Sequence, residues 1–265
     1  MSNTIEKTFR ELERQKRPAF MPFFVAGFPN LNISLKTIEL AAKYSNIIEI
    51  GVPYSDPLAD GSTIQAAASA ALSRGMNTKR TLVLVSTLRK RGVKTPIVLM
   101  LYANLIEQVG IEKFFRKAAH AGVDGVIIPD VPLEESVPFR EAAKRQEVKF
   151  ISLVGLATSK SRLRQIDAAG DGFLYLVSVL GTTGARKNVG FPCVMYLRKA
   201  KKLNLRLPIC VGFGISDKKQ AQTLVRAGSR GYIVGSTLVQ FIHKNHSKTN
   251  FYKSFERLLK SFIIV

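Results

Sequence analysis

Eight short apolar runs recur along the 265-residue chain, and they constrain the fold more than any other feature. Each run is apolar at consecutive positions, which indicates strands buried on both faces, as in parallel sheets. The runs span residues 20–27, 47–52, 96–103, 125–130, 150–155, 173–178, 209–214 and 231–236. We therefore expect eight parallel strands.

Segments with the apolar spacing of helices separate these runs. The clearest span residues 34–45, 81–91, 110–122 and 217–228. Several helical segments end in glycine, at Gly122, Gly170 and Gly228. Glycine at this position commonly adopts the left-handed conformation that ends a helix, so we expect it at these three residues.

Eight strands alternating with helices in about 250 residues are typical of a (β/α)8 TIM barrel. A doubly wound open sheet is the alternative, but its usual strand count is lower and no GxGxxG motif opens the first unit. The N-terminal segment places Ile5, Phe9 and Leu12 on one helical stripe, which predicts an extra helix closing the bottom of the barrel. Because no Pro- or Ser-rich linker interrupts the chain, we expect residues 1–265 to form a single domain.

The charge of the chain is strongly basic, since 40 Lys and Arg residues stand against 19 Asp and Glu residues, giving +21. The basic residues are scattered over several polar faces, and no aromatic-rich basic ribbon or zinc-finger pattern accompanies them. This distribution favours a solvated basic surface over a nucleic-acid-binding module. Nucleic-acid binding remains an alternative of a different class, which a salt-sensitive gel shift would reveal.

The sequence also bears on the compartment. No apolar run is long enough to span a membrane, and the N-terminus lacks the apolar region of a secretory signal. Cys193 and Cys210 lack metal-ligand spacing and suggest free thiols in a reducing compartment. We expect a cytoplasmic protein with no metal site, or a protein of the plastid stroma if the gene is organelle-encoded.

A carboxylate, Glu49, lies almost at the end of the second apolar run. A buried acid is costly unless it is paired, and burial raises its pKa toward the range useful for proton transfer. A glutamate satisfied by a neighbouring hydroxyl or backbone group is the structural alternative, but buried glutamates are rare enough that function is favoured. Asp60, in the following loop, would alone suggest a turn; beside Glu49 it completes a candidate acid–base pair.

Other polar residues also fall near predicted strand ends, where a barrel places its active groups. Tyr102 and Asn104 end the third run, Asp130 ends the fourth, and Tyr175 and Ser178 lie in the sixth. Phe23 and Phe213 are equally consistent with core packing or with lining an apolar slot.

Glycine-containing turns follow the last three predicted strands, at residues 181–186, 212–216 and 235–238. In this fold the loops after strands seven and eight, with a short helix N-terminus, recurrently bind phosphate through backbone N–H groups. The turns therefore predict a phosphate site that needs no lysine cluster.

The stretch EIGVPYSDPLADGSTIQAA resembles the signature of the tryptophan synthase alpha subunit family, and the similarity covers nearly the whole chain. LMLYANL, GVDGVIIPDVPLEES, YLVSVLGTTGAR, VGFGIS and IVGST follow in the family's order. The resemblance implies a lyase that cleaves indole-3-glycerol phosphate to indole and glyceraldehyde 3-phosphate without a metal or organic cofactor. Indole then passes to a beta subunit, which carries pyridoxal phosphate, in an alpha2-beta2 heterotetramer.

The resemblance also implies roles for individual residues. Glu49 would protonate the indole ring carbon and help to deprotonate the glycerol hydroxyl. Asp60 would accept a hydrogen bond from the indole N–H. Thr183 would hydrogen-bond Asp60, and Asp56 would meet the beta subunit. The walls of the indole slot would be Phe23, Tyr102, Ile127, Tyr175 and Phe213. The phosphate site would be Gly184, Gly214, Gly235 and Ser236.

Two further alternatives share the fold but not the activity. A degenerate alpha subunit would act only as an allosteric partner, which the presence of Glu49, Asp60 and the glycine turns argues against. A stand-alone indole-releasing lyase would show substantial turnover with no beta subunit present. The unusual +21 charge suggests a beta partner with an acidic contact surface.

Overall fold

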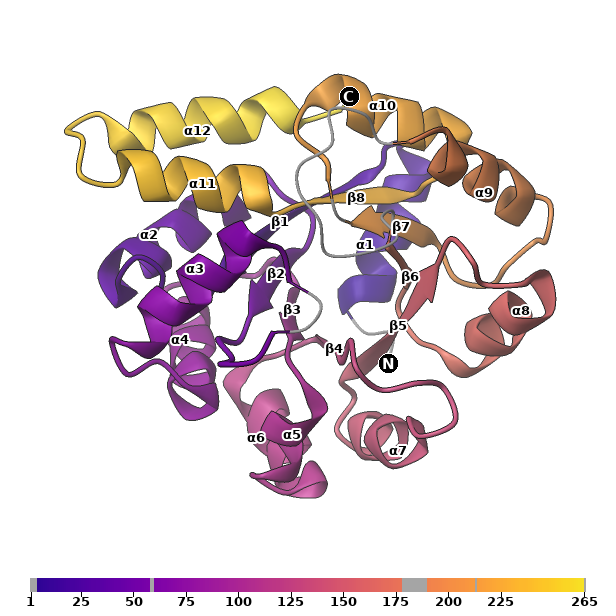
Figure 1. Ribbon diagram of the computed structural model, residues 1–265, viewed down its shortest axis with the longest axis horizontal. Helices are drawn as coiled ribbons and strands as arrows, with labels where there is room; N and C mark the ends of the chain where they lie inside the picture. The colour runs from indigo at the N-terminus through magenta and orange to yellow at the C-terminus, as the bar shows by residue number, and fades with distance from the viewer. Residues whose placement is uncertain (1–3, 58–59, 178–189, 213, 265) are drawn as a thin grey trace.

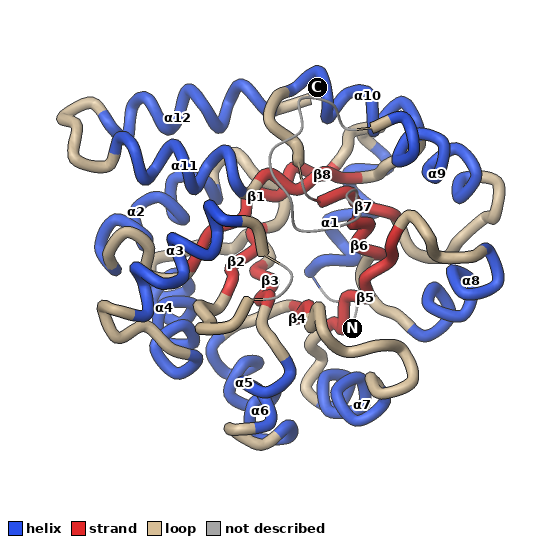
Figure 2. The backbone as a smooth tube through the Cα atoms, in the orientation of Figure 1, coloured by secondary structure: helices blue, strands red, loops and turns tan. Residues whose placement is uncertain are grey.

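The computed structural model describes residues 4–57, 60–177, 190–212 and 214–264. Within them, parallel strands close into a barrel that helices surround as an outer ring (Figures 1 and 2). The strands are β1 (Ala19–Val25), β2 (Ile48–Gly51), β3 (Ile97–Met100), β4 (Gly125–Ile127), β5 (Lys149–Gly155), β6 (Leu174–Val177), β7 (Ile209–Gly212) and β8 (Gly231–Val234).

The sheet is closed because each strand pairs with the next and the last pairs with the first. β1 and β8 run parallel, with Ala19 opposite Gly231 and Met21 opposite Ile233. The prediction of a (β/α)8 barrel is confirmed, and the open sheet is excluded. Most strand residues are fully buried, as expected for strands with the barrel interior on one face and helices on the other.

The helices follow the strands in the expected alternation, with extra helices after β2, β3 and β8. They are α1 (Thr4–Arg14), α2 (Leu31–Ala42), α3 (Ser62–Leu72), α4 (Thr78–Lys90), α5 (Ala103–Glu107), α6 (Ile111–Ala121), α7 (Val137–Arg145), α8 (Lys160–Ala169), α9 (Phe191–Lys201), α10 (Lys218–Ala227), α11 (Ser236–Asn245) and α12 (Phe251–Phe262). No helix in these ranges is long and apolar enough to cross a membrane.

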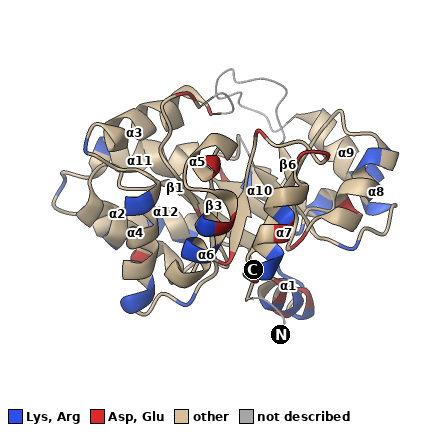
Figure 3. Ribbon diagram, turned by 90° about the horizontal axis from the view of Figure 1, so that it is seen from below, with Lys and Arg blue, Asp and Glu red and all other residues tan. Residues whose placement is uncertain are grey.

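Helix α1 covers the end of the barrel at which the strands begin, as the sequence predicted (Figures 1 and 3). Ile5 is fully buried, and its side chain lies where a side chain at Gly125 or Gly172 would otherwise fit. Phe9 packs its ring against Phe173, with the ring centroids 5.8 Å apart. The apolar stripe of α1 therefore closes the floor of the barrel.

The expected left-handed helix ends hold at two of the three glycines. Gly122 and Gly228 have φ values of +90° and +122°. The expectation for Gly170 is wrong, because its φ is −82° and its backbone is extended. Close packing explains this glycine instead: an added Cβ would lie 3.0 Å from the carbonyl oxygen of Ile166 and 3.1 Å from Oγ of Ser152.

Several strands end earlier than the apolar runs suggested, and at β3 and β4 the difference concerns polar residues. β3 stops at Met100, so Tyr102 caps α5 and Asn104 lies inside that helix. β4 stops at Ile127, and Asp130 lies in the turn that follows. Both differences move polar side chains from strand ends into the loops above them, where the fold places active groups.

Among the described residues, the basic side chains lie mainly over the helices and around α1, and few are seen at the upper rim of the molecule in Figure 3. Several helices carry them in their last turns, for example Arg89 and Lys90 in α4 and Lys144 and Arg145 in α7. Positive charge there is favourable because a helix dipole is negative at its C-terminus. This placement supports the solvated basic surface expected from the sequence.

Candidate active site

Glu49 lies in the middle of β2, between Phe23 of β1 and Val98 of β3. Its side chain is 2% exposed, and neither carboxylate oxygen has a hydrogen-bond partner among the described residues. Burial, and secondarily the charge of Asp60, raises the pKa of Glu49 to about 8. At neutral pH this carboxyl is therefore mostly protonated and able to donate a proton.

Asp60 lies just before α3, and its pKa is raised to about 6 by burial. At neutral pH it is therefore mostly ionised. The structure thus brings together the two acids that the sequence singled out, since the charge of Asp60 acts on Glu49. One carboxyl holds its proton while the other carries charge, which is the division expected of an acid–base pair.

Tyr175 of β6 faces the same pair. Burial raises its pKa well above the ordinary value, and the charges of Glu49 and Asp60 add to the effect. Its ring occupies space that the absence of a side chain at Gly212 leaves open, because a Cβ there would lie 2.1 Å from the phenol oxygen. A glycine on β7 is therefore required for Tyr175 to reach this position.

Phe23 of β1 is accommodated in the same way by two glycines. A Cβ at Gly51 would lie 2.7 Å from Cζ of Phe23, and one at Gly235 would lie 3.3 Å from its Cδ1. The Phe23 ring therefore lies between the ends of β2 and β8, on the side of the barrel where Glu49 is found. The structure places it in the interior beside the acids and not in the outer helix layer.

Ile127 comes from β4, and Tyr102 comes from the N-terminal cap of α5, just after β3. A Cβ added at Gly125 would point at Ile5 in the floor of the barrel, so position 125 faces the interior. Ile127 is fully buried and lies two residues further along the strand, so its side chain faces the interior as well. The Tyr102 ring packs on Tyr54, with centroids 4.9 Å apart, and the hydroxyl of Tyr54 accepts a 2.6 Å hydrogen bond from Nδ2 of Asn104.

The predicted phosphate site lies after β7 and β8. Gly214 has a φ of +77°, a conformation that favours glycine, and Gly235 immediately precedes α11, which begins at Ser236. The first N–H groups of a helix have no partner within it and carry the positive end of its dipole. The start of α11 can therefore bind an anion.

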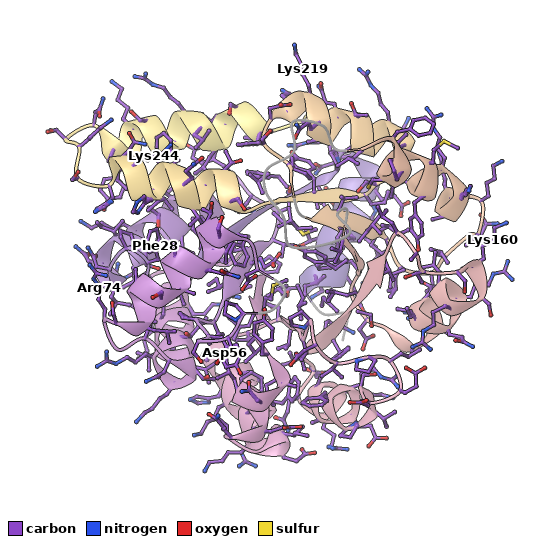
Figure 4. The ribbon with its side chains drawn as sticks, in the orientation of Figure 1. Phe28, Asp56, Arg74, Lys160, Lys219 and Lys244 are labelled. Carbon is purple, nitrogen blue, oxygen red and sulfur yellow. The ribbon has the colours of Figure 1, made fainter. Side chains whose placement is uncertain are left out.

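Other predicted residues lie at the margins of the described structure. Asp56 is exposed, accepts a 2.6 Å hydrogen bond from Oγ of Ser55, and lies on the side of the molecule where α5 is seen (Figure 4). Three predicted site residues, Thr183, Gly184 and Phe213, lie outside the described residues. Among the described residues, no three His, Cys, Asp or Glu side chains are grouped as a metal site would require.

Four residues of this region escaped the sequence analysis. Gly51 and Gly212 are needed because aromatic rings from adjacent strands fill their space, and a glycine inside a strand signals such a close approach. Tyr54 accepts a hydrogen bond from Asn104 of α5, and Gln65 donates one to the backbone oxygen of Asp60. The close approaches at Gly51 and Gly212 and the pairing of Tyr54 with Asn104 depend on distances across the fold, whereas Gln65 reaches an acceptor five residues earlier in the chain.

Two surface grooves, of about 1100 and 850 Å³, lie elsewhere, at the end of the barrel where the strands begin. Asp124 and Lys149 line the first, while Arg17 and Arg230 line the second. Neither groove includes Glu49 or Asp60. The unpaired buried carboxyl is the better marker of chemistry, because surface grooves between helices are common in this fold.

The tryptophan synthase alpha chain family model matches residues 9–262. The chain belongs to this family. Its similarity to the alpha chain of Geobacillus kaustophilus is 45% identity, covering 86% of this chain and 84% of that protein. The alpha chain of Methanocaldococcus jannaschii is 39% identical, covering 91% of this chain and 85% of its own length.

Solved structures of the family agree with the fold. A tryptophan synthase alpha chain from Legionella pneumophila superposes with a TM-score of 0.89 at 30% identity, covering 99% of this chain and 96% of that one. A chain from the a2b2 complex of Pyrococcus furiosus gives 0.85 at 34% identity, covering 93% and 98%. The resemblance drawn from the sequence motifs is confirmed by these matches.

Proposed function

We propose that this chain is the carbon–carbon lyase of tryptophan biosynthesis that cleaves indole-3-glycerol phosphate to indole and glyceraldehyde 3-phosphate. The observation that carries the proposal is Glu49, a buried carboxyl with no hydrogen-bond partner among the described residues, beside the ionised Asp60. A purely structural acid would be paired, because an unpaired buried carboxyl costs stability. The family indicates which reaction to expect. A protonated acid beside an ionised one suits that reaction.

The two acids take different steps. Glu49, protonated at neutral pH, gives its proton to the indole carbon that bears the side chain. Asp60, ionised, accepts a hydrogen bond from the indole N–H and stabilises the positive charge that develops on the protonated ring. The carbon–carbon bond then breaks as the Glu49 carboxylate takes the proton of the adjacent hydroxyl, leaving an aldehyde and restoring the acid.

The remaining residues hold the substrate at its two ends. Phe23, Tyr102, Ile127 and Tyr175 form the slot for the indole ring, with Phe213 as its fifth member. Gly214, Gly235 and Ser236 bind the phosphate through backbone N–H groups, together with Gly184, and Thr183 hydrogen-bonds Asp60. The steps assigned here use the chain's own residues, so we assign no metal or organic cofactor to it.

The product indole passes to a tryptophan synthase beta subunit, in which the pyridoxal phosphate resides, within an alpha2-beta2 heterotetramer. Support comes from the Pyrococcus furiosus relative, whose solved structure is that of an a2b2 complex with mutual activation. We assign Asp56 to the contact with this partner, and its exposure on the loop after β2 supports that role.

The test is indole release from indole-3-glycerol phosphate by the purified chain, with and without a beta subunit, beside Glu49→Gln. Wild type should release indole, faster with the partner, and the variant should lose about 10³-fold in kcat, the usual effect of removing a general acid–base group. Wild-type turnover that is undetectable with the fold intact would leave a degenerate regulatory subunit. Equal and high turnover without the partner would indicate a stand-alone lyase.

A further inference from the structure

Gln65 connects the catalytic loop to helix α3. It lies in the first turn of α3, and its Nε2 donates a 2.9 Å hydrogen bond to the backbone oxygen of Asp60 and a 3.4 Å one to that of Pro57. Side chains of a helix lean toward its N-terminus, so a residue one turn inside α3 is able to reach back over the preceding segment. The two acceptors flank residues 58–59, which lie outside the described residues.

The same segment is held at its beginning by Tyr54. Its ring packs on Tyr102 at 4.9 Å, and its hydroxyl accepts the 2.6 Å hydrogen bond from Asn104. The backbone N–H of Ala103, which lies between Tyr102 and Asn104 in the sequence, donates to both carboxylate oxygens of Asp130, at 3.1 and 3.2 Å. The segment from Tyr54 to Asp60 is thus attached to α5 at one end and to α3 at the other.

The chemical type of Gln65 fits this task. A glutamate would place a negative charge against two carbonyl oxygens and near Asp60. A lysine would pair with Asp60 and lower its pKa. A neutral amide donor fixes the backbone of Asp60 and leaves the charge of the pair with Glu49 unaltered.

We propose that Gln65 is a positioning residue for the lyase reaction, holding Asp60 in its half-buried place through the backbone, with Tyr54 fixing the other end of the segment. The inference rests on the proposed function. Gln65 itself is exposed and makes no contact with the reacting atoms, so its effect passes through Asp60.

The experiment compares Gln65→Met, which keeps the shape and removes the donor, with Gln240→Met. Gln240 is an exposed glutamine on α11 and serves as the matched control. With the beta subunit present, Gln65→Met should lower kcat about tenfold and leave KM within about twofold, because misplacement of a catalytic group costs rate. The melting temperature should stay that of wild type, since the lost bond is on the surface.

A second measurement does not depend on activity. Carbon-13 NMR titration of the Asp60 carboxyl should give a pKa near 6 in wild type and Gln240→Met. In Gln65→Met it should fall toward the ordinary value of about 3.9, because a released Asp60 becomes hydrated. The titrating groups that face Asp60 among the described residues, Glu49 on β2 and Tyr175 on β6, are intact in both variants.

The two measurements separate the possible failures. An unchanged Asp60 titration in Gln65→Met, or a kcat equal to that of Gln240→Met, would overturn the positioning role even in an active enzyme. Wild type that releases no indole would overturn the proposed function, while the NMR titration would still decide whether Gln65 holds Asp60. Tyr54→Phe, with Tyr252→Phe as its control, should cause a smaller loss of kcat in the same direction.

Discussion

The two ends of the barrel treat buried carboxylates in opposite ways. At the end where the strands begin, Asp124 accepts hydrogen bonds from Nη2 of Arg89 at 2.5 Å, from the Ile97 N–H at 2.8 Å and from Thr4. Asp167 accepts from two consecutive backbone N–H groups, of Arg206 and Leu207, both at 2.8 Å. At the other end, Glu49 has no such partner among the described residues.

The difference separates hydrogen-bonded acids from the acid to which we assign the proposed chemistry. A carboxylate with several donors is fixed in place, because each hydrogen bond holds one of its oxygens. A buried carboxyl without donors has a pKa near neutrality and can give and take a proton, at the expense of folding stability. The barrel therefore stabilises itself at one end and places its chemistry at the other.

The largest expected effect is on stability at Glu49. The pKa of Glu49 is about 8 in the folded state and 4.5 in the unfolded state. Between pH 4.5 and pH 8, the folded state therefore keeps a proton that the unfolded state has lost. Stability thus falls as pH rises from about 4.5 to 8, by at most about 5 kcal/mol at 1.36 kcal/mol per pKa unit. Glu49→Gln should lack this fall, so urea unfolding should show the variant to be more stable above pH 8. Parallel stability curves for the two proteins would contradict the burial argument.

Removing a hydrogen-bonded carboxylate at the end where the strands begin should lower stability, whereas Glu49→Gln should raise it above pH 8. Asp124→Ala removes the ion-pair partner of the Arg89 guanidinium, whose side chain is only 22% exposed, and should cost about 3 kcal/mol in the free energy of unfolding. The kcat of the folded protein should not change. Glu39→Ala, which removes the more exposed pair with Arg91, is the matched control and should cost less than about 1 kcal/mol. Equal losses in the two variants would show that the carboxylate at this end is not specially stabilising.

Asp60→Asn should lower kcat/KM about a hundredfold, or about 2.7 kcal/mol, by removing the charge that stabilises the cationic ring. Because the Asp60 pKa is raised to about 6, wild-type kcat/KM should fall as pH drops below 6, and the variant should lose this dependence. Asp171→Asn, an exposed acid at the other end of the barrel, should match wild type throughout. An acid limb that persists in Asp60→Asn would assign the titration to another group.

The smallest expected effect concerns the walls of the site. Gly212→Ala places a methyl group 2.1 Å from the Tyr175 hydroxyl, so the ring must move. We expect a loss of about 1–2 kcal/mol in stability, typical of overpacking, and about a tenfold loss in kcat/KM. Gly155→Ala, at the end of β5 with no atom within 4 Å of an added Cβ, should change neither. Identical behaviour of the two variants in the indole-release assay would remove Tyr175 from the site.

The charge of the chain also differs between regions. The +21 net charge arises largely from helix positions, including the final turns of α4, α7 and α9. Glu49 and Asp60 lie outside those turns. Such charges act on helix dipoles and on the solvent. These positions give the basic residues no role in the proposed chemistry.

The sequence by itself predicted the barrel and singled out its candidate catalytic acid. Eight short apolar runs alternating with helical segments indicate strands covered on both faces, and Glu49 stood out because a charge inside such a run is costly. The same reasoning was wrong at Gly170, where a local rule for helix ends was overridden by packing against Ile166, Ser152 and Leu207.

Only the tertiary structure decided which groups Glu49 and Asp60 would meet. Several observations describe contacts in the folded chain. Asp124 has hydrogen-bond donors while Glu49 has none among the described residues, Gly212 makes room for Tyr175, and Gln65 reaches the backbone of Asp60. Local pattern carries the period of a strand or helix, but hydrogen-bond partners and burial depend on which elements the closed sheet brings together. The pKa of an acid follows from those partners and not from its place in the chain.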